Sequence, residues 1–78
     1  MMPVLITDTA TLGAELRKAR KALKITQGEL SLQTGISRPT IQSIERGKET
    51  AQVGLVLQLC QDLGIAIEVR FPEVVSRS

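Results

Sequence analysis

The spacing of apolar residues predicts two amphipathic helices at the two ends of the helical part of the chain. Asp8 or Thr9 can cap the first, whose apolar positions recur every three or four residues: Leu12, Leu16, Ala19 and Leu23. The second is expected from about residue 52 to 63, ending at Gly64. Its apolar residues are expected in the core: Val53, Val56, Leu57, Cys60 and Leu63.

Between these helices, residues 26 to 48 read TQGELSLQTGISRPTIQSIERGK, which predicts two short helices joined by a glycine. Thr26 and Glu29 have the spacing of a capping box, and Gly35 supplies the left-handed residue that ends the first short helix. Ser37 caps the second, which has Pro39 in its first turn. Ile41 and Ile44 of this second short helix are expected to face inward, and Gly47 is expected to end it.

After the last helix, the sequence IAIEVRF alternates strictly between apolar and polar residues, which is typical of a β-strand. The only candidate partner within the chain is PVLIT, residues 3 to 7, and the sequence leaves open whether this segment joins a sheet. We therefore expect a mainly α fold with one C-terminal strand. Its parts are an N-terminal arm (1–8), a helical domain (9–64), a strand (65–71) and a flexible tail (72–78).

Composition limits the chemistry that is expected of the chain. Its 78 residues suffice for one domain, and a hydrophobic content of 42% can fill one modest core. Histidine is absent and cysteine occurs once, so one chain cannot assemble a zinc site or a catalytic triad. We expect no enzymatic activity, metal or cofactor. The single cysteine favours the cytoplasm, and neither a signal peptide nor a membrane span is expected.

The net charge is only +2, but the basic residues are unevenly distributed. Residues 15 to 24, ELRKARKALK, hold five basic residues and one acidic residue. This run can form a basic patch or simply the solvated face of a helix, and the solvated face is the commoner case. Charge alone therefore does not decide the function.

Two helices as short as those predicted within residues 26 to 48 are marginal in isolation, so contacts with the rest of the fold must fix them. In a helix-turn-helix, the first helix crosses the DNA backbone and the second presents its N-terminal residues to the major groove. On that geometry, the polar residues opposite Ile41 and Ile44 would face DNA: Ser37, Arg38, Thr40 and Ser43. An ordinary helical hairpin has the same periodicity, so the pattern alone leaves both interpretations open.

The motif T-Q-x-E-L-x-x-x-x-G-I-S-R-x-T-I-x-x-I-E-R-G-K resembles the helix-turn-helix core of the Xre family, which includes phage Cro and repressor proteins. The similarity covers residues from about 10 to 65 and implies a lambda-repressor-like fold that binds double-stranded DNA. It also implies that Arg20 and Glu45 form a partly buried ion pair, as the equivalent positions do in similar phage repressors.

The same resemblance implies roles for individual residues. Gln27 would hold a phosphate and support the recognition helix, and Ser37 would lie close to the backbone. The base readers would be Arg38, Thr40 and Ser43, and the phosphate-binding residues after the recognition helix would be Arg46 and Lys48. Pro39 departs from the family, whose members often have a polar base reader there, so it would make only apolar contacts, for instance with a thymine methyl group.

The sequence QDLGIAIEVRF at the end of the fourth helix is similar to HipB-type antitoxins. This resemblance implies a homodimer that binds a palindromic operator in its own promoter and that also binds a HipA-type kinase toxin. The terminal strands of two chains would pair across the dimer through Ile65, Ile67, Glu68, Val69, Arg70 and Phe71.

Two alternatives remain open from the sequence. A free-standing phage or restriction-controller repressor would differ only in lacking a toxin partner. A protein-interaction module that kept the fold but lost DNA binding is the other alternative. The presence of Arg38, Arg46 and Lys48 on the expected DNA face argues against it.

Overall fold

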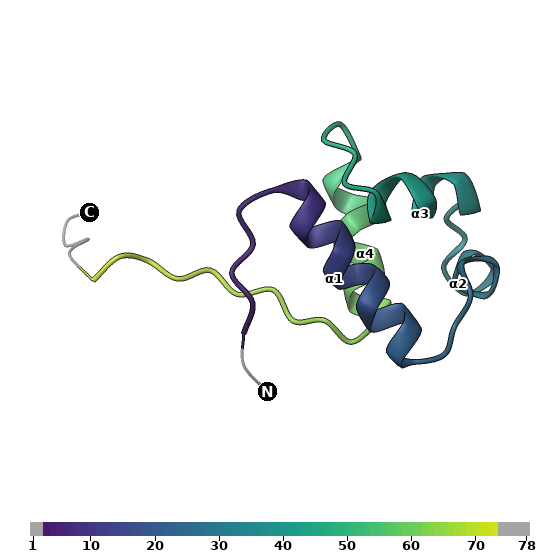
Figure 1. Ribbon diagram of the computed structural model, residues 1–78, viewed down its shortest axis with the longest axis horizontal. Helices are drawn as coiled ribbons and strands as arrows, with labels where there is room; N and C mark the ends of the chain where they lie inside the picture. The colour runs from purple at the N-terminus through teal and green to yellow at the C-terminus, as the bar shows by residue number, and fades with distance from the viewer. Residues whose placement is uncertain (1–2, 74–78) are drawn as a thin grey trace.

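The computed structural model describes residues 3–73 and contains four helices in that part of the chain. Helices α2 and α3 lie next to each other at one end, while the described C-terminal segment runs away from the other end (Figure 1). The helix bounds are α1 Thr9–Ala22, α2 Gln27–Thr34, α3 Arg38–Glu45 and α4 Val53–Asp62. None of these helices is long and apolar enough to cross a membrane.

Local signals explain where the helices begin and end. Asp8 caps α1 by accepting a hydrogen bond from the backbone N–H of Thr11 at 2.7 Å. The capping box of α2 is complete, because Thr26 Oγ1 accepts from the Glu29 N–H at 3.0 Å and Glu29 Oε1 accepts from the Thr26 N–H at 2.8 Å. Gly35 ends α2 with φ 78°, a left-handed conformation in which a Cβ atom is unfavourable. These sequence predictions are confirmed.

The core lies where the four helices meet, and it corrects the predicted inward faces of α1 and α4. Its buried apolar residues are Leu16, Leu30, Ile36, Ile41, Ile44, Leu59, Cys60 and Leu63. The prediction that Val53, Leu57 and Leu23 face the core is wrong, because their side chains are 70%, 46% and 53% exposed. Cys60 and Leu63 are buried as predicted, but apolar residues occupy nearly every side of α4, so periodicity identified its buried face only in part and missed Leu59.

Helix α1 touches the end of α3 at Gly13, where the two backbones approach closely. A Cβ atom on Gly13 would lie 2.6 Å from the carbonyl oxygen of Glu45 and would also overlap the carbonyl oxygen of Ile44. Of the glycines inside helices, Gly13, Gly28 and Gly54, only Gly13 makes such a close backbone contact in the single chain.

The Gly13→Ala substitution is therefore expected to lower the free energy of unfolding by about 1 to 3 kcal/mol, because α1 and α3 must separate to admit the methyl group. Gly54→Ala is the matched control, since nothing lies within 4 Å of the added atom, and it should be neutral or stabilising by up to about 1 kcal/mol. Urea unfolding of both variants measures the difference. Equal stabilities would contradict the close contact at Gly13.

Residues 65 to 71 form no strand in the single chain, and no strand occurs anywhere in residues 3–73. Ile65 packs against the core, but Ile67, Val69 and Phe71 are 53%, 76% and 78% exposed. A strand exists only with a hydrogen-bonding partner, and the described N-terminal arm does not supply one. The single chain therefore does not confirm the predicted strand or its pairing.

Candidate nucleic-acid interface

A buried ion pair joins α1 to the end of α3. Arg20 Nε donates to Glu45 Oε2 at 2.7 Å and Arg20 Nη2 donates to Glu45 Oε1 at 3.0 Å. The remaining guanidinium nitrogen, Nη1, donates to the carbonyl oxygen of Ile25 at 2.8 Å. This is the ion pair that the sequence predicted, and its two-point geometry fixes α3 against α1 and the turn before α2.

Gln27 joins α2 to the same carboxylate. Its Nε2 donates to Glu45 Oε1 at 3.1 Å, so the first residue of α2 supports the last residue of α3. Through this contact Gln27 supports the recognition helix, as the sequence led us to expect. Its role in binding phosphate stays a prediction.

The environment of Glu45 keeps its side chain ionised. Burial alone raises the pKa of this carboxyl group. Hydrogen bonds from Arg20 and Gln27 and the positive charges of Arg20 and Arg17 all lower the pKa, and together they outweigh the effect of burial. The pKa of Glu45 therefore lies below its ordinary value, and the carboxylate remains a permanent acceptor at neutral pH.

Helix α3 has one buried side and one exposed side. Ile41, Ile44 and Glu45 are buried, while Arg38, Pro39 and Gln42 are exposed, as is Arg46 directly after the helix. Gln42 was missed by the sequence analysis. Its position four residues after the predicted base reader Arg38, on the same side of the helix, is the signal that could have identified it.

The predicted polar face of α3 is less open than expected. Ser37 and Arg38 are exposed, whereas Thr40 and Ser43 are half-buried. The Ser37 hydroxyl caps α3 by accepting from the Thr40 N–H at 3.3 Å, and it also shares a hydrogen bond with the Thr40 hydroxyl at 2.8 Å. These contacts position the first turn of α3.

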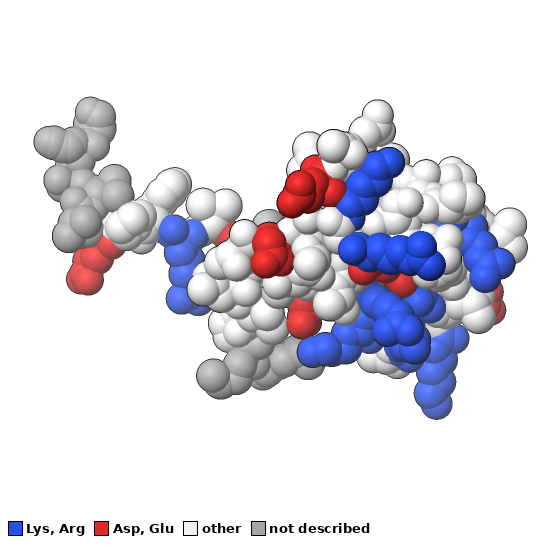
Figure 2. Space-filling model, turned by 45° about the horizontal axis from the view of Figure 1, so that its top comes forward, with Lys and Arg blue, Asp and Glu red and all other residues white. Residues whose placement is uncertain are grey.

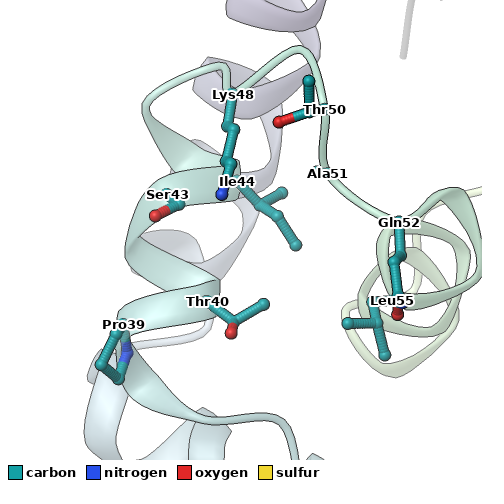
Figure 3. Close-up of a pocket in the computed structure, with 9 residues that line it drawn as sticks. All are labelled: Pro39, Thr40, Ser43, Ile44, Lys48, Thr50, Ala51, Gln52 and Leu55. Carbon is teal, nitrogen blue, oxygen red and sulfur yellow. The ribbon is translucent and has the colours of Figure 1, made fainter.

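A pocket of about 430 Å³ explains why Thr40 and Ser43 are half-buried. It separates α3 from the start of α4 (Figure 3), and it brings together four predicted DNA-binding residues: Pro39, Thr40, Ser43 and Lys48. Thr40 points into it from α3, and Gln52 and Leu55 lie across from it (Figure 3). Thr50 and Gln52 were missed by the sequence analysis, because only the folded chain brings them beside α3.

The turn after α3 holds the two basic residues expected to bind phosphate. Arg46 and Lys48 are both exposed and flank Gly47, which has φ 89° and lies against Ala10 of α1. Thr9 Oγ1 donates to the Gly47 carbonyl oxygen at 2.7 Å, so the start of α1 fixes this turn. The arrangement places a rigid basic turn directly after the exposed helix.

Comparison with known proteins identifies the arrangement. The Helix-turn-helix family model HTH_3 matches residues 16–69. The chain belongs to the Xre-type helix-turn-helix family. It is 40% identical over 67 residues to the "Uncharacterized HTH-type transcriptional regulator y4mF" of Sinorhizobium fredii (strain NBRC 101917 / NGR234), covering 86% of this chain and 88% of that protein. In this helix-turn-helix domain, α2 is the first helix of the motif and α3 is the second.

Solved structures share the same fold. The "HipB-O4 20mer complex" matches with a TM-score of 0.81 and 20% sequence identity, covering 91% of this chain and 100% of that chain. The "Structure of HipA-HipB-O2-O3 complex" matches with the same TM-score, identity and coverage. At this level of identity, these helix-turn-helix proteins establish the fold of the present chain.

Proposed function

We propose that the protein is a transcriptional repressor that binds a palindromic DNA operator as a homodimer. The observation that carries this proposal is the division of α3 between a fixed side and a free side. Arg20 and Gln27 hold Glu45 at the end of α3, while the opposite side of the helix is exposed. Such a helix is pre-organised to enter a major groove, because binding requires no further ordering of its backbone.

In this proposal, the residues around α3 have different roles in DNA recognition. Arg38 is the chief base reader, and Pro39 makes apolar contacts beside it. Thr40 and Ser43 read bases from the edge of the pocket between α3 and the start of α4. Phosphates are held by Gln27, Arg46 and Lys48, with Ser37 close to the backbone.

The proposal extends to a toxin-antitoxin system. The structures that share the fold of this chain include HipB with an O4 20mer and HipB together with HipA. By analogy, the protein represses its own operon and binds a HipA-type kinase toxin. Co-purification with a kinase encoded beside its gene, and loss of that kinase's activity in the complex, would support the antitoxin role, whereas independent elution of both proteins would contradict it.

Footprinting on the DNA upstream of the gene tests the repressor function directly. We expect two protected half-sites related by a two-fold axis and separated by about one helical turn, 34 to 36 Å, or a multiple of it. The salt concentration must be stated, since affinity for DNA falls steeply with salt. Uniform protection at every sequence, or none, would contradict a specific repressor.

Replacing Arg38 by alanine should weaken binding to the operator by about 1 to 3 kcal/mol and relax the preference at one base pair, because arginine can donate two hydrogen bonds to guanine. Lys48→Ala is the matched control at a phosphate-binding position, and it should weaken binding to all sequences alike. Titrations of operator and random DNA measure both effects. An unchanged ratio of specific to non-specific affinity in Arg38→Ala would rule out Arg38 as the base reader.

A further inference from the structure

Helix α1 has a row of residues that continues outward from its contact with α3. Residues four apart lie on the same side of a helix, so Gly13, Arg17 and Lys21 form one row. Gly13 lies against the backbone of Glu45, while Arg17 and Lys21 are exposed. The two cations therefore continue the row that begins at the contact of Gly13 with the end of α3.

Arg17 also acts electrostatically on the helix-turn-helix through Glu45. Arg17 is close enough for its charge to stabilise the Glu45 carboxylate. The same carboxylate accepts a hydrogen bond from Gln27 at 3.1 Å. The charge of Arg17, one turn along α1 from Gly13, thus acts on the carboxylate that Gln27 also contacts, and the proposed function puts a DNA phosphate at Gln27.

The basic residues of α1 differ in how they are neutralised. Lys18 forms an ion pair with Glu15 at 3.4 Å. Within residues 3–73, neither Arg17 nor Lys21 forms an ion pair. Figure 2 shows Lys and Arg side chains gathered on one face of the molecule, with few acidic groups among them. A local excess of positive charge of this kind attracts a polyanion.

We propose that Arg17 and Lys21, the α1 edge, bind backbone phosphates of duplex DNA beside those held by the helix-turn-helix. This inference rests on the proposed function and adds α1 to the interface. Neither residue was assigned to DNA from the sequence, where the solvated face of a helix was the commoner interpretation of the basic run. The α1 edge carries no base-reading role, because phosphate contacts do not depend on sequence.

The test compares single-charge variants of α1 on a short duplex of random sequence. The affinity of wild type, Lys21→Gln and Lys18→Gln is measured between about 50 and 200 mM salt, where log affinity falls by about 0.9 per log unit of salt for each phosphate contact. Lys21→Gln should reduce this slope by about 0.9 per chain, and the double variant Arg17→Gln/Lys21→Gln by about twice as much. Lys18→Gln removes the same charge from the same helix and should keep the wild-type slope.

The outcomes separate this inference from the function on which it rests. A wild-type protein that binds no duplex would overturn both. If the wild type binds duplex but Lys21→Gln shows the same dependence of affinity on salt as Lys18→Gln, only the phosphate-binding role of the α1 edge is overturned. Lys21→Gln decides the result if the double variant unfolds, because Arg17 also stabilises the buried Glu45 carboxylate while Lys21 is exposed. Urea unfolding of each variant shows whether it is folded.

Discussion

Replacing Arg20 by methionine is expected to lower the free energy of unfolding by about 3 to 5 kcal/mol, because the Glu45 carboxylate would stay buried without its cation. The site is dry enough for an effect of this size, since the two side chains are only 8% and 4% exposed. Total stability of a small domain is about 5 to 15 kcal/mol, so the variant would lose a large part of it. Urea unfolding measures the change.

Lys18→Met is the matched control, because it removes a cation from the same helix, and a surface pair such as that of the exposed Lys18 with Glu15 is worth about 0 to 1 kcal/mol. A double-mutant cycle with Glu45→Leu completes the test. Arg20→Met/Glu45→Leu should be more stable than Arg20→Met alone, because no buried charge remains unpaired. Additive losses, with no coupling between the two positions, would contradict the role assigned to this pair.

The pH dependence of stability gives a second readout of the same pair. The folded state holds the pKa of Glu45 below its ordinary value, so the ionised carboxylate stabilises the fold above the unfolded pKa of about 4.3. This contribution is lost as the pH falls through the lower pKa of the folded state. Stability should therefore decline in acid more steeply in the wild type than in Glu45→Gln.

The elements that the sequence predicted correctly depend on neighbouring residues. The capping box of Thr26 and Glu29, the left-handed Gly35 and the Ser37 cap each satisfy backbone groups within a few positions, so the motif alone specifies them. The buried pair of Arg20 and Glu45 was different. It followed from resemblance to phage repressors, because spacing gives no information on which helices touch.

The features that the sequence missed depend on distant parts of the chain. The inward face of α4 was misjudged in part, because Val53 and Leu57 are as apolar as the buried Leu59, and only packing against the other helices distinguishes them. Thr50 and Gln52 reach the pocket beside α3 through the same packing. The DNA-binding roles of residues such as Arg38 stay predictions, because they require the partner as well as the fold.

Deleting residues 66–78 is expected to convert the proposed dimer into a monomer and to weaken operator binding by about 100- to 10,000-fold, because two linked half-site contacts become one. Ile67, Val69 and Phe71 are exposed in the single chain, as are Val53 and Leu57 of α4. A second copy would cover such apolar surface and would pair the unsatisfied backbone groups of the segment. Ile65 is retained in the deletion because it packs against the core. A stable dimer of the shortened chain in sedimentation would contradict this assignment.

The register of the proposed strand pairing can be tested by exchanging charges in the full-length chain. Glu68 and Arg70 are exposed, and an antiparallel pair centred on Val69 sets each Glu68 opposite Arg70 of the other chain. Glu68→Arg should then weaken the dimer, because like charges face each other at two symmetric positions at a cost of about 0.2 to 1 kcal/mol each. The double variant Glu68→Arg/Arg70→Glu restores opposite charges in this register and should recover the dimer. A pair centred on Glu68 would instead leave the double variant with two positive charges directly opposite, so failure to recover in sedimentation would exclude the register centred on Val69.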